Sequence, residues 1–239
     1  MTGLAAWRGL SATTLLLLLA GCFFNHGENL PRAAEALDRS AQEPPRPERF
    51  TLCRDHGCMS EKPVSLGADA WQHIVEPLHR AAATPADERR QVAQAVGRFE
   101  LAAGPQAGTA TDIGGTLTGY GAGGQQDCVD EAVNTTRFLQ MLKKAGLLRH
   151  HEVSTPVHRA WIPDELTHLT ATLVEHGSRE RYAIDSWFHG NGHAAEVVDI
   201  EAWLEGWQPA VWRFEAASPA DSQPKLASDG ETRATIPAR

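Results

Sequence analysis

The chain has 239 residues, of which 42% are hydrophobic and 22% are charged. This length and apolar content suffice for one large domain with a hydrophobic core, and they exclude a chain that is disordered throughout. Four cysteines are too few for a disulfide-rich miniature scaffold, and a formal net charge of -8 argues against binding to the phosphate backbone of nucleic acids. We therefore expect one folded domain and no nucleic-acid partner.

The first residues predict an export signal that ends at a cysteine. Arg8 is followed by a leucine run at 15–19 and by small residues directly before Cys22, an order typical of secretory signal peptides. The run is too short to span a bilayer, which takes about 20 apolar residues. Leu19-Ala20-Gly21-Cys22 resembles the lipobox of bacterial lipoproteins, which implies lipidation of Cys22. An ordinary signal peptide or an uncleaved anchor is the alternative.

Composition divides the rest of the chain into three parts. Prolines and charged residues at 22–48 predict a flexible tether after a signal peptide at 1–21, with room for a short helix around residues 32–39. We expect the domain at 49–214 and, because the composition turns to Ala, Ser, Pro and Asp, a disordered tail at 215–239. Since Phe23 rather than Asp follows Cys22, the lipoprotein resemblance implies an outer-membrane anchor with the domain facing the periplasm.

Two cysteines lie close together at the start of the domain. Cys53 and Cys58 are separated by four residues, and in an oxidising compartment this spacing favours a disulfide that fixes a local hairpin. A zinc site that includes His56 is the competing interpretation, although no second Cys/His pair stands nearby at ligand spacing.

Two helices and a glycine-rich loop are expected next. Trp71, Ile74, Val75 and Leu78 recur at helical spacing, and Pro77 should end or kink that helix. A second helix should begin after Thr84, with a proline in its first position and an apolar stripe at 92, 96 and 99. Residues 104–124 contain eight glycines, and a loop this long is often functional.

The loop ends where a third helix is expected to begin. Asp127 is a natural N-cap, apolar residues follow at helical spacing, and Gly146 supplies a stop. Cys128 then occupies the first helical position, where the helix dipole favours a thiolate. Asp127, Asp130 and Glu131 oppose this effect, so the thiol would need a histidine partner. A cysteine used as a small core residue is the alternative.

The partner is expected on a β-hairpin. Residues 168–174 and 181–188 alternate as two strands around a polar turn, and folding about 177–178 places His168 opposite Trp187. Asp185 then lies on the same face, within diagonal reach of His168. His158, on an expected strand at 153–161, is the rival base.

These residue types fit nucleophilic catalysis by a thiol. Cys128 would be the nucleophile, His168 would take and return its proton, and Asp185 would hold the imidazole and stabilise its charged form. The backbone N–H of Cys128 is the first candidate for an oxyanion donor, and the side-chain amide of Gln126 or Gln125 is the second.

The order and spacing of Cys128, His168 and Asp185 resemble the transglutaminase-like branch of the papain-like superfamily, particularly bacterial transglutaminase-like cysteine proteinases. Asp127-Cys128-Val129-Asp130 is similar to the Asp-Cys-x-Asp signature of that group. The resemblance covers residues 124–190. It implies an α+β fold with a papain-like core, in which the nucleophile helix packs on an antiparallel sheet, and acyl transfer on amides through a thioester. Periplasmic peptidases of the group use calcium, but no calcium ligands can be matched here, so we expect no cofactor.

The sequence therefore predicts a monomeric envelope lipoprotein with a Cys-His-Asp thiol hydrolase or acyltransferase domain, acting on amide bonds of an envelope protein or peptide. A non-catalytic binding module on the same fold is the first alternative. A metal-binding protein that uses His189 and His193, or Cys53 and Cys58, is the second, although a surface loop near the cleft is the preferred interpretation of residues 189–193. The tryptophans at 161, 187, 203 and 207 could line a groove, but core packing is the preferred interpretation.

Overall fold

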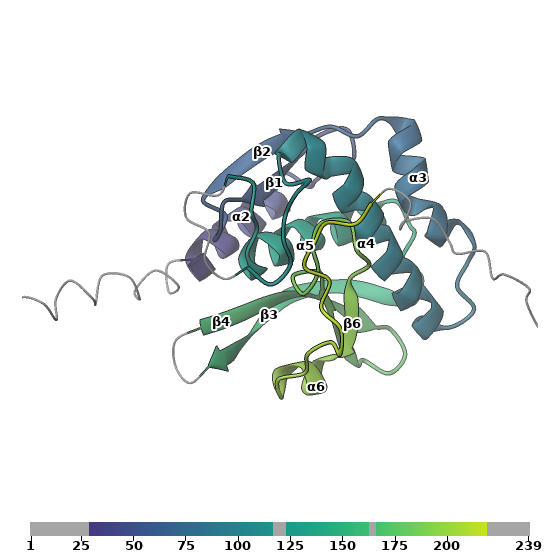
Figure 1. Cartoon of the computed structure of the whole chain (residues 1–239). Coiled ribbons are helices and arrows are strands. Elements are labelled where there is room, and N and C mark those ends of the chain that lie inside the picture. The colour runs from purple at the N-terminus through teal and green to yellow at the C-terminus, as the bar shows by residue number, and fades with distance from the viewer. Residues whose placement is uncertain (1–28, 117–122, 163–165, 219–239) are drawn as a thin grey trace, which may run out of the picture.

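The computed structural model describes residues 29–116, 123–162 and 166–218 (Figure 1). Its elements in chain order are α2 (Asn29–Gln42), β1 (Phe50–Arg54), β2 (Ser60–Val64), α3 (Ala68–His79), α4 (Pro85–Ala107), α5 (Cys128–Lys144), β3 (His151–Ile162), β4 (Leu166–Glu175), β5 (Arg181–Asp185), β6 (Glu196–Asp199) and α6 (Ile200–Leu204). The expected signal peptide and Cys22 lie outside the described residues. Within those residues, no helix has both the length and the apolar character needed to cross a bilayer.

The fold is of the α+β class, as the sequence predicted. Strands β3 to β6 form an antiparallel sheet in the order β3-β4-β5-β6, and β1 pairs with β2 in a separate antiparallel hairpin. In Figure 1, α4 and α5 lie on one side of the larger sheet and α6 lies on the other side. Helix α5 contacts β3, β4 and β5 of this sheet and also contacts α2 and β1.

The main core lies between α4, α5 and the sheet. Phe99 of α4 stacks on Phe138 of α5 with ring centroids 4.6 Å apart. Leu139 and Leu142 of α5 are fully buried in the same cluster as Leu173 of β4. Burial of each such side chain contributes about 1.5–3 kcal/mol. This packing fixes α5, and with it the position of the cysteine at its first residue.

The expected starts of the second and third helices are confirmed. Thr84 and Asp87 form a capping box at the start of α4, and Asp127 and Asp130 form one at the start of α5. Each box satisfies backbone N–H groups that a helix start leaves without intrahelical acceptors.

Two expected helix ends lie further along the chain than predicted. Helix α4 continues through Pro105 to Ala107 and ends at Gly108, whose φ is 79°. The glycine-rich loop therefore begins four residues later than expected, because Ala103 and Ala107 continue the buried stripe. Helix α3 likewise includes Pro77 and continues to His79, since Leu78 is buried after the proline.

The segment expected to be a flexible tether contains helix α2, which packs on the domain. Ala33 and Ala36 are buried in the same cluster as Val133 of α5. Arg137 of α5 donates to the backbone oxygen of Ala36 and to the hydroxyl of Ser40. The short helix allowed around residues 32–39 is thus present but longer, and it belongs to the packed domain. The structure therefore corrects the tether prediction over residues 29–42.

The expected boundary of the tail also moves. The backbone N–H of Ala217 donates to the oxygen of Asn191 at 2.8 Å, and Ala217 is buried. The packed chain thus extends a few residues past the predicted end at 214. Residues 219–239 of the expected tail lie outside the described residues.

Candidate active site

The hairpin that carries the expected base and acid has the register that the sequence predicted. Ala171 pairs with Ile184, and Val174 pairs with Arg181, which is the pairing expected for a turn centred on residues 177–178. The same register brings His168, near the start of β4, diagonally across from Asp185, the last residue of β5.

His168 and Asp185 form a buried hydrogen-bonded pair. His168 Nε2 lies 2.6 Å from Asp185 Oδ2, and both side chains are almost completely buried. Trp203 Nε1 donates to the same carboxylate oxygen at 2.7 Å. The carboxylate is thus held from two directions, and it fixes the orientation of the imidazole. Nothing in the sequence predicted the bond from Trp203, because it depends on how α6 folds back on the sheet.

Aromatic rings enclose the imidazole. The ring centroid of His168 lies 4.6 Å from Trp187, 5.4 Å from Phe188 and 5.2 Å from Trp203. Trp187 and Trp203 are buried, so they pack around the histidine instead of lining an open groove. The rings keep water from the His168–Asp185 pair and thereby strengthen its electrostatic interaction.

Cys128 occupies the first position of α5, as predicted, and its sulfur meets the strand that carries the histidine. Its Sγ lies 3.5 Å from the backbone oxygen of Thr167, and the backbone N–H of Leu169 also interacts with it. These two backbone groups flank His168 in the chain. The pairing of β4 with β5 begins at Ala171. The sulfur therefore contacts the part of β4 that precedes this pairing. The structure therefore brings all three predicted residues to one place.

The thiol is protonated at rest. Cys128 is only 3% exposed, and burial, together with the charges of Asp127, Asp185 and Asp130, raises the pKa of the Cys128 thiol well above its ordinary value. The N–H of Leu169 lowers this pKa but does not offset the other effects. The helix start alone therefore does not produce a thiolate, as the acidic sequence around Cys128 had indicated.

The structure does not direct the expected amide donors at the sulfur. The Nε2 of Gln126 donates to the backbone oxygen of Cys53 at 3.1 Å, and the Nε2 of Gln125 donates to that of Thr111 at 3.1 Å. Both amides hold the glycine-rich loop in place. The backbone N–H of Cys128 is the remaining candidate, because the first N–H groups of a helix have no intrahelical acceptor.

The predicted disulfide is confirmed, and its loop caps the nucleophile helix. Cys53 and Cys58 are bonded, and the N–H groups of His56 and Cys58 donate to the two carboxylate oxygens of Asp130 at 2.8 Å each. The N–H of Gly57 donates to Asp127 Oδ2 at 2.9 Å. Consecutive backbone N–H groups thus form a nest for the two acids beside Cys128. The sequence predicted the bond but not this role.

Further buried acids lie at the start of α5, on the helix itself and in the preceding loop. Burial raises the pKa of Asp112 to about 9 and that of Glu131 to about 7, in each case with help from neighbouring carboxylates. The hydroxyl of Ser186, the residue after Asp185, donates to Glu131 Oε2 at 2.6 Å. Protonation of Asp112 at neutral pH reduces the negative charge near the candidate site.

The other candidate histidines, one for the base and two for a metal site, lie in environments different from that of His168. His158 is exposed on β3. His189 is buried, whereas a surface loop had been expected for it, and its Nε2 lies 2.7 Å from Glu196 Oε1. His193 Nε2 lies 3.0 Å from the backbone oxygen of Glu215. These contacts explain the two loop histidines without a metal ion.

The competing zinc interpretation of the Cys53 segment can be tested against the same geometry. Within the described residues, Cys53, Cys58 and Glu61 place their potential ligand atoms within 4.8 Å of one another. The two sulfurs are bonded to each other, however, and zinc binds cysteine as a thiolate. The oxidised protein therefore does not offer this ligand set.

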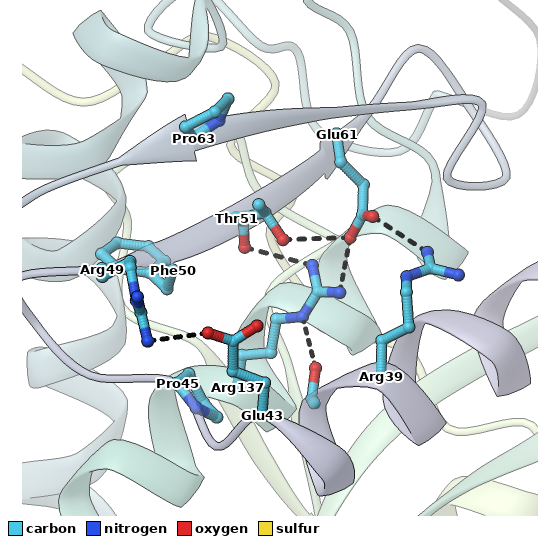
Figure 2. A pocket seen from close by; sticks show the side chains of 10 residues that line it. Arg39, Glu43, Pro45, Arg49, Phe50, Thr51, Glu61, Pro63 and Arg137 are labelled. Carbon is cyan, nitrogen blue, oxygen red and sulfur yellow. Dashed lines mark hydrogen bonds and ion pairs between the residues drawn. The ribbon is translucent and has the colours of Figure 1, made fainter.

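A cavity of about 330 Å³ lies apart from Cys128, between α2 and the β1–β2 hairpin. Figure 2 shows its polar wall, where Glu61 faces both Arg137 and Arg39. Arg137 NH2 donates to Glu61 Oε1 at 2.5 Å, and Arg39 NH2 donates to Glu61 Oε2 at 2.9 Å. Pro45, Phe50 and Pro63 supply apolar lining. The guanidinium of Arg137 thus joins α2, α5 and the hairpin.

Comparisons of the chain with protein-family models, with curated proteins and with solved structures found no match. The assignment of a function therefore depends on the residues and their geometry.

Proposed function

We propose that the protein is a thiol-dependent amide hydrolase or acyltransferase of the transglutaminase-like type, with a papain-like core and with Cys128, His168 and Asp185 as its catalytic triad. The observation that carries the proposal is the buried 2.6 Å contact between His168 and Asp185. His168 lies on β4, and the backbone of β4 contacts the Cys128 sulfur. A cysteine at the start of a helix that packs on an antiparallel sheet supports the same conclusion.

The proposed reaction begins with proton transfer from Cys128 Sγ to His168 Nδ1, since Nε2 is held by Asp185. The sulfur then attacks the amide carbonyl, and the backbone N–H of Cys128 stabilises the oxyanion. The imidazolium returns its proton to the leaving amine, and a thioester forms. Water or a second amine then breaks the thioester, with His168 as the base. Because the thiol is protonated at rest, this transfer has to precede attack.

We further propose that the substrate is a protein or peptide of the bacterial cell envelope. The lipobox resemblance at Cys22 supports a lipid-anchored protein that faces the periplasm, on the outer membrane. The Cys53–Cys58 disulfide is consistent with an oxidising compartment.

Alkylation of the thiol tests the proposal directly. We expect iodoacetamide and a thiol-directed peptide probe to label Cys128 in the folded protein, and His168→Ala to slow both reactions at least tenfold while the circular dichroism spectrum stays unchanged. Peptide mass spectrometry separates Cys128 from the other cysteines. If Cys128 reacts no faster than a free model thiol across pH 5–8, and if His168→Ala leaves its rate unchanged, the assignment of the nucleophile is wrong.

One observation favours a second function, a non-catalytic module that binds envelope proteins or peptides. Cys128 is buried, and the pKa of its thiol is raised. A binding module would keep this closed arrangement when its ligand is present. Unchanged labelling of Cys128 in the presence of a bound envelope peptide would favour that function over catalysis.

A further inference from the structure

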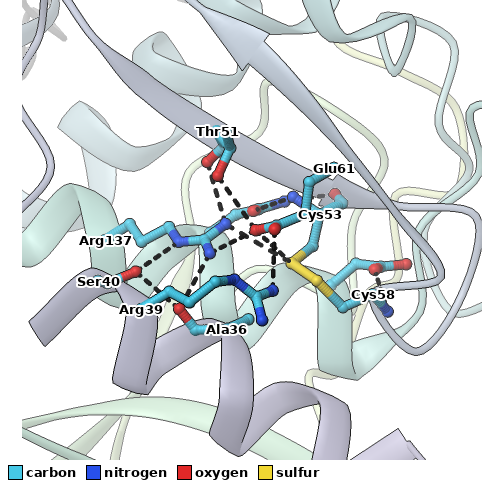
Figure 3. A network of polar contacts seen from close by, with 10 residues as sticks. Ala36, Arg39, Ser40, Thr51, Cys53, Cys58, Glu61 and Arg137 are labelled. Carbon is cyan, nitrogen blue, oxygen red and sulfur yellow. Dashed lines mark hydrogen bonds and ion pairs between the residues drawn. A yellow bond between two sulfur atoms is a disulfide. The ribbon is translucent and has the colours of Figure 1, made fainter. Parts of the chain in front are cut away.

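The two sulfurs of the Cys53–Cys58 disulfide have different electrostatic surroundings. Arg137 NH1 lies 3.6 Å from Cys53 Sγ, and Figure 3 shows the guanidinium directed at this sulfur from α5. The Arg137 side chain is only 3% exposed. Its positive charge is therefore weakly screened where it meets Cys53.

The groups around Cys53 carry a net positive charge. Glu61 Oε1 lies 3.9 Å from Cys53 Sγ and is the opposing charge. Glu61, however, accepts hydrogen bonds from both Arg137 and Arg39, so that two guanidinium groups face one carboxylate. The nearby Arg54 and Asp55 form an ion pair with each other at 2.9 Å and add no net charge.

Carboxyl groups hold the backbone of the loop that carries Cys58. Its backbone N–H and that of His56 donate to Asp130, and the intervening Gly57 donates to Asp127. Burial raises the pKa of Asp130 well above its ordinary value, which reduces this negative charge. The guanidinium of Arg137 thus reaches Cys53 Sγ, whereas the charged groups bound by the Cys58 segment are carboxyl groups.

Access to the two sulfurs also differs. Cys53 is 0% exposed and Cys58 is 8% exposed. A thiolate that attacks a disulfide must approach one sulfur and expel the other, and expulsion is faster for the thiol with the lower pKa. Exposure therefore favours attack at Cys58, and charge favours departure of Cys53.

We propose that Cys53–Cys58 is a redox-active disulfide that a dithiol reductant opens by attack at Cys58, with Cys53 as the leaving thiolate beside Arg137. The first thiolate of the reductant forms a bond to Cys58 Sγ, the Cys53–Cys58 bond breaks, and its electron pair leaves with Cys53. The second thiol of the reductant, as its thiolate, then displaces Cys58. Cys58 and Cys53 become thiols or thiolates, and the dithiol is oxidised to a disulfide by loss of two electrons and two protons.

Reduction would loosen the disulfide loop that binds the first turn of α5. The effect of this change on catalysis rests on the proposed function of Cys128. Residues 55–58 all have left-handed backbones, with φ of 70°, 66°, 64° and 55°. Such a backbone is strained for each non-glycine residue. The disulfide and the bonds to Asp127 and Asp130 hold this loop in place. Once the disulfide is open, the loop can relax and release these acids beside Cys128.

Trapping of the first adduct tests the proposal on the full chain. The native protein is treated with glutathione, quenched with acid, and digested so that mass spectrometry locates each mixed disulfide. We expect adducts at Cys58 to exceed those at Cys53, since a leaving thiol is expelled faster when its thiolate is stabilised and the greater exposure of Cys58 adds to this preference. Equal amounts, an excess at Cys53, or no adduct without denaturant would overturn the proposal.

Two exposed arginines provide a matched pair of variants. Arg39→Met removes one of the two charges that neutralise Glu61 and should reduce the preference for Cys58 adducts. Arg49→Met is the control, because Arg49 pairs with the exposed Glu43 at 2.7 Å, whereas Glu61 pairs with Arg39 and Arg137. An equal effect of the two variants would contradict the charge argument.

A separate measurement addresses the link to Cys128. Alkylation of Cys128 is followed before and after reduction with dithiothreitol, and we expect at least a threefold change in its rate. If reduction leaves the alkylation rate of Cys128 unchanged while adducts still form at Cys58, the link between the disulfide and Cys128 is wrong and the redox proposal stands. If Cys128 does not react in either state, the proposed function fails while the adduct result still stands.

Discussion

Replacement of Asp185 by Asn is the sharpest test of the proposed triad. Oδ2 of Asp185 accepts from both His168 Nε2 and Trp203 Nε1. An asparagine can keep an oxygen at this position, so both bonds can persist without the charge. A hydrogen bond to a charged group contributes about 1.5–3 kcal/mol and a neutral one about 0.5–1.5 kcal/mol. We therefore expect Asp185→Asn to remove about 1–2 kcal/mol from the stabilisation of a protonated imidazole.

The assay is alkylation of Cys128 between pH 6 and pH 9, read by peptide mass spectrometry. A loss of 1–2 kcal/mol in the transition state corresponds to a rate about 5- to 30-fold lower. Asp199→Asn is the control, because Asp199 is an exposed N-cap of α6 and asparagine caps helices equally well. If Asp185→Asn reacts within twofold of the unmodified protein while its circular dichroism spectrum is unchanged, the role assigned to Asp185 is wrong.

Three further predictions follow from the site. His168→Ala should lower probe labelling of Cys128 by about 10²-fold or more, as expected for loss of a general base, whereas replacement of the exposed His158 should leave labelling unchanged. Asp127→Ala should lower the free energy of unfolding in urea by about 1–2 kcal/mol through loss of the N-cap, with Thr84→Ala of α4 as the comparison. The pKa of Glu131 is about 7 in the folded protein, against an ordinary value of 4.5, so the free energy of unfolding should fall as pH rises between these two values. Glu131→Gln should flatten this fall. An equal pH slope in both proteins would contradict the pKa argument.

Local patterns predicted the positions of the three catalytic candidates. The N-cap of α5 follows from Asp127 and the stripe after it, because a helix start depends on neighbouring residues. The hairpin register follows from alternation on the two strands around a polar turn. A slip of one residue would have moved every side chain of a strand to the opposite face of the sheet. Both signals lie within a few residues of the element that they define.

Contacts between distant segments could not be predicted in the same way. The nest that binds Asp130 comes from residues more than 70 positions earlier in the chain, and the bond from Trp203 to Asp185 depends on the path after β6. The amide of Gln126 lies near Cys128 in sequence but is bound by Cys53 of β1. The burial of α2 against Arg137 is likewise a property of the folded core.

Helix α2 sets a limit on how far the domain could stand from a membrane. If Cys22 carries the lipid, only residues 23–28 separate it from the first residue of the helix, and such a stretch reaches at most about 25 Å. A tether that extended to residue 48 would have allowed several times this reach. On the proposed function, substrates would then have to come to a domain held close to the lipid headgroups, which would favour proteins of the membrane surface over those further from it.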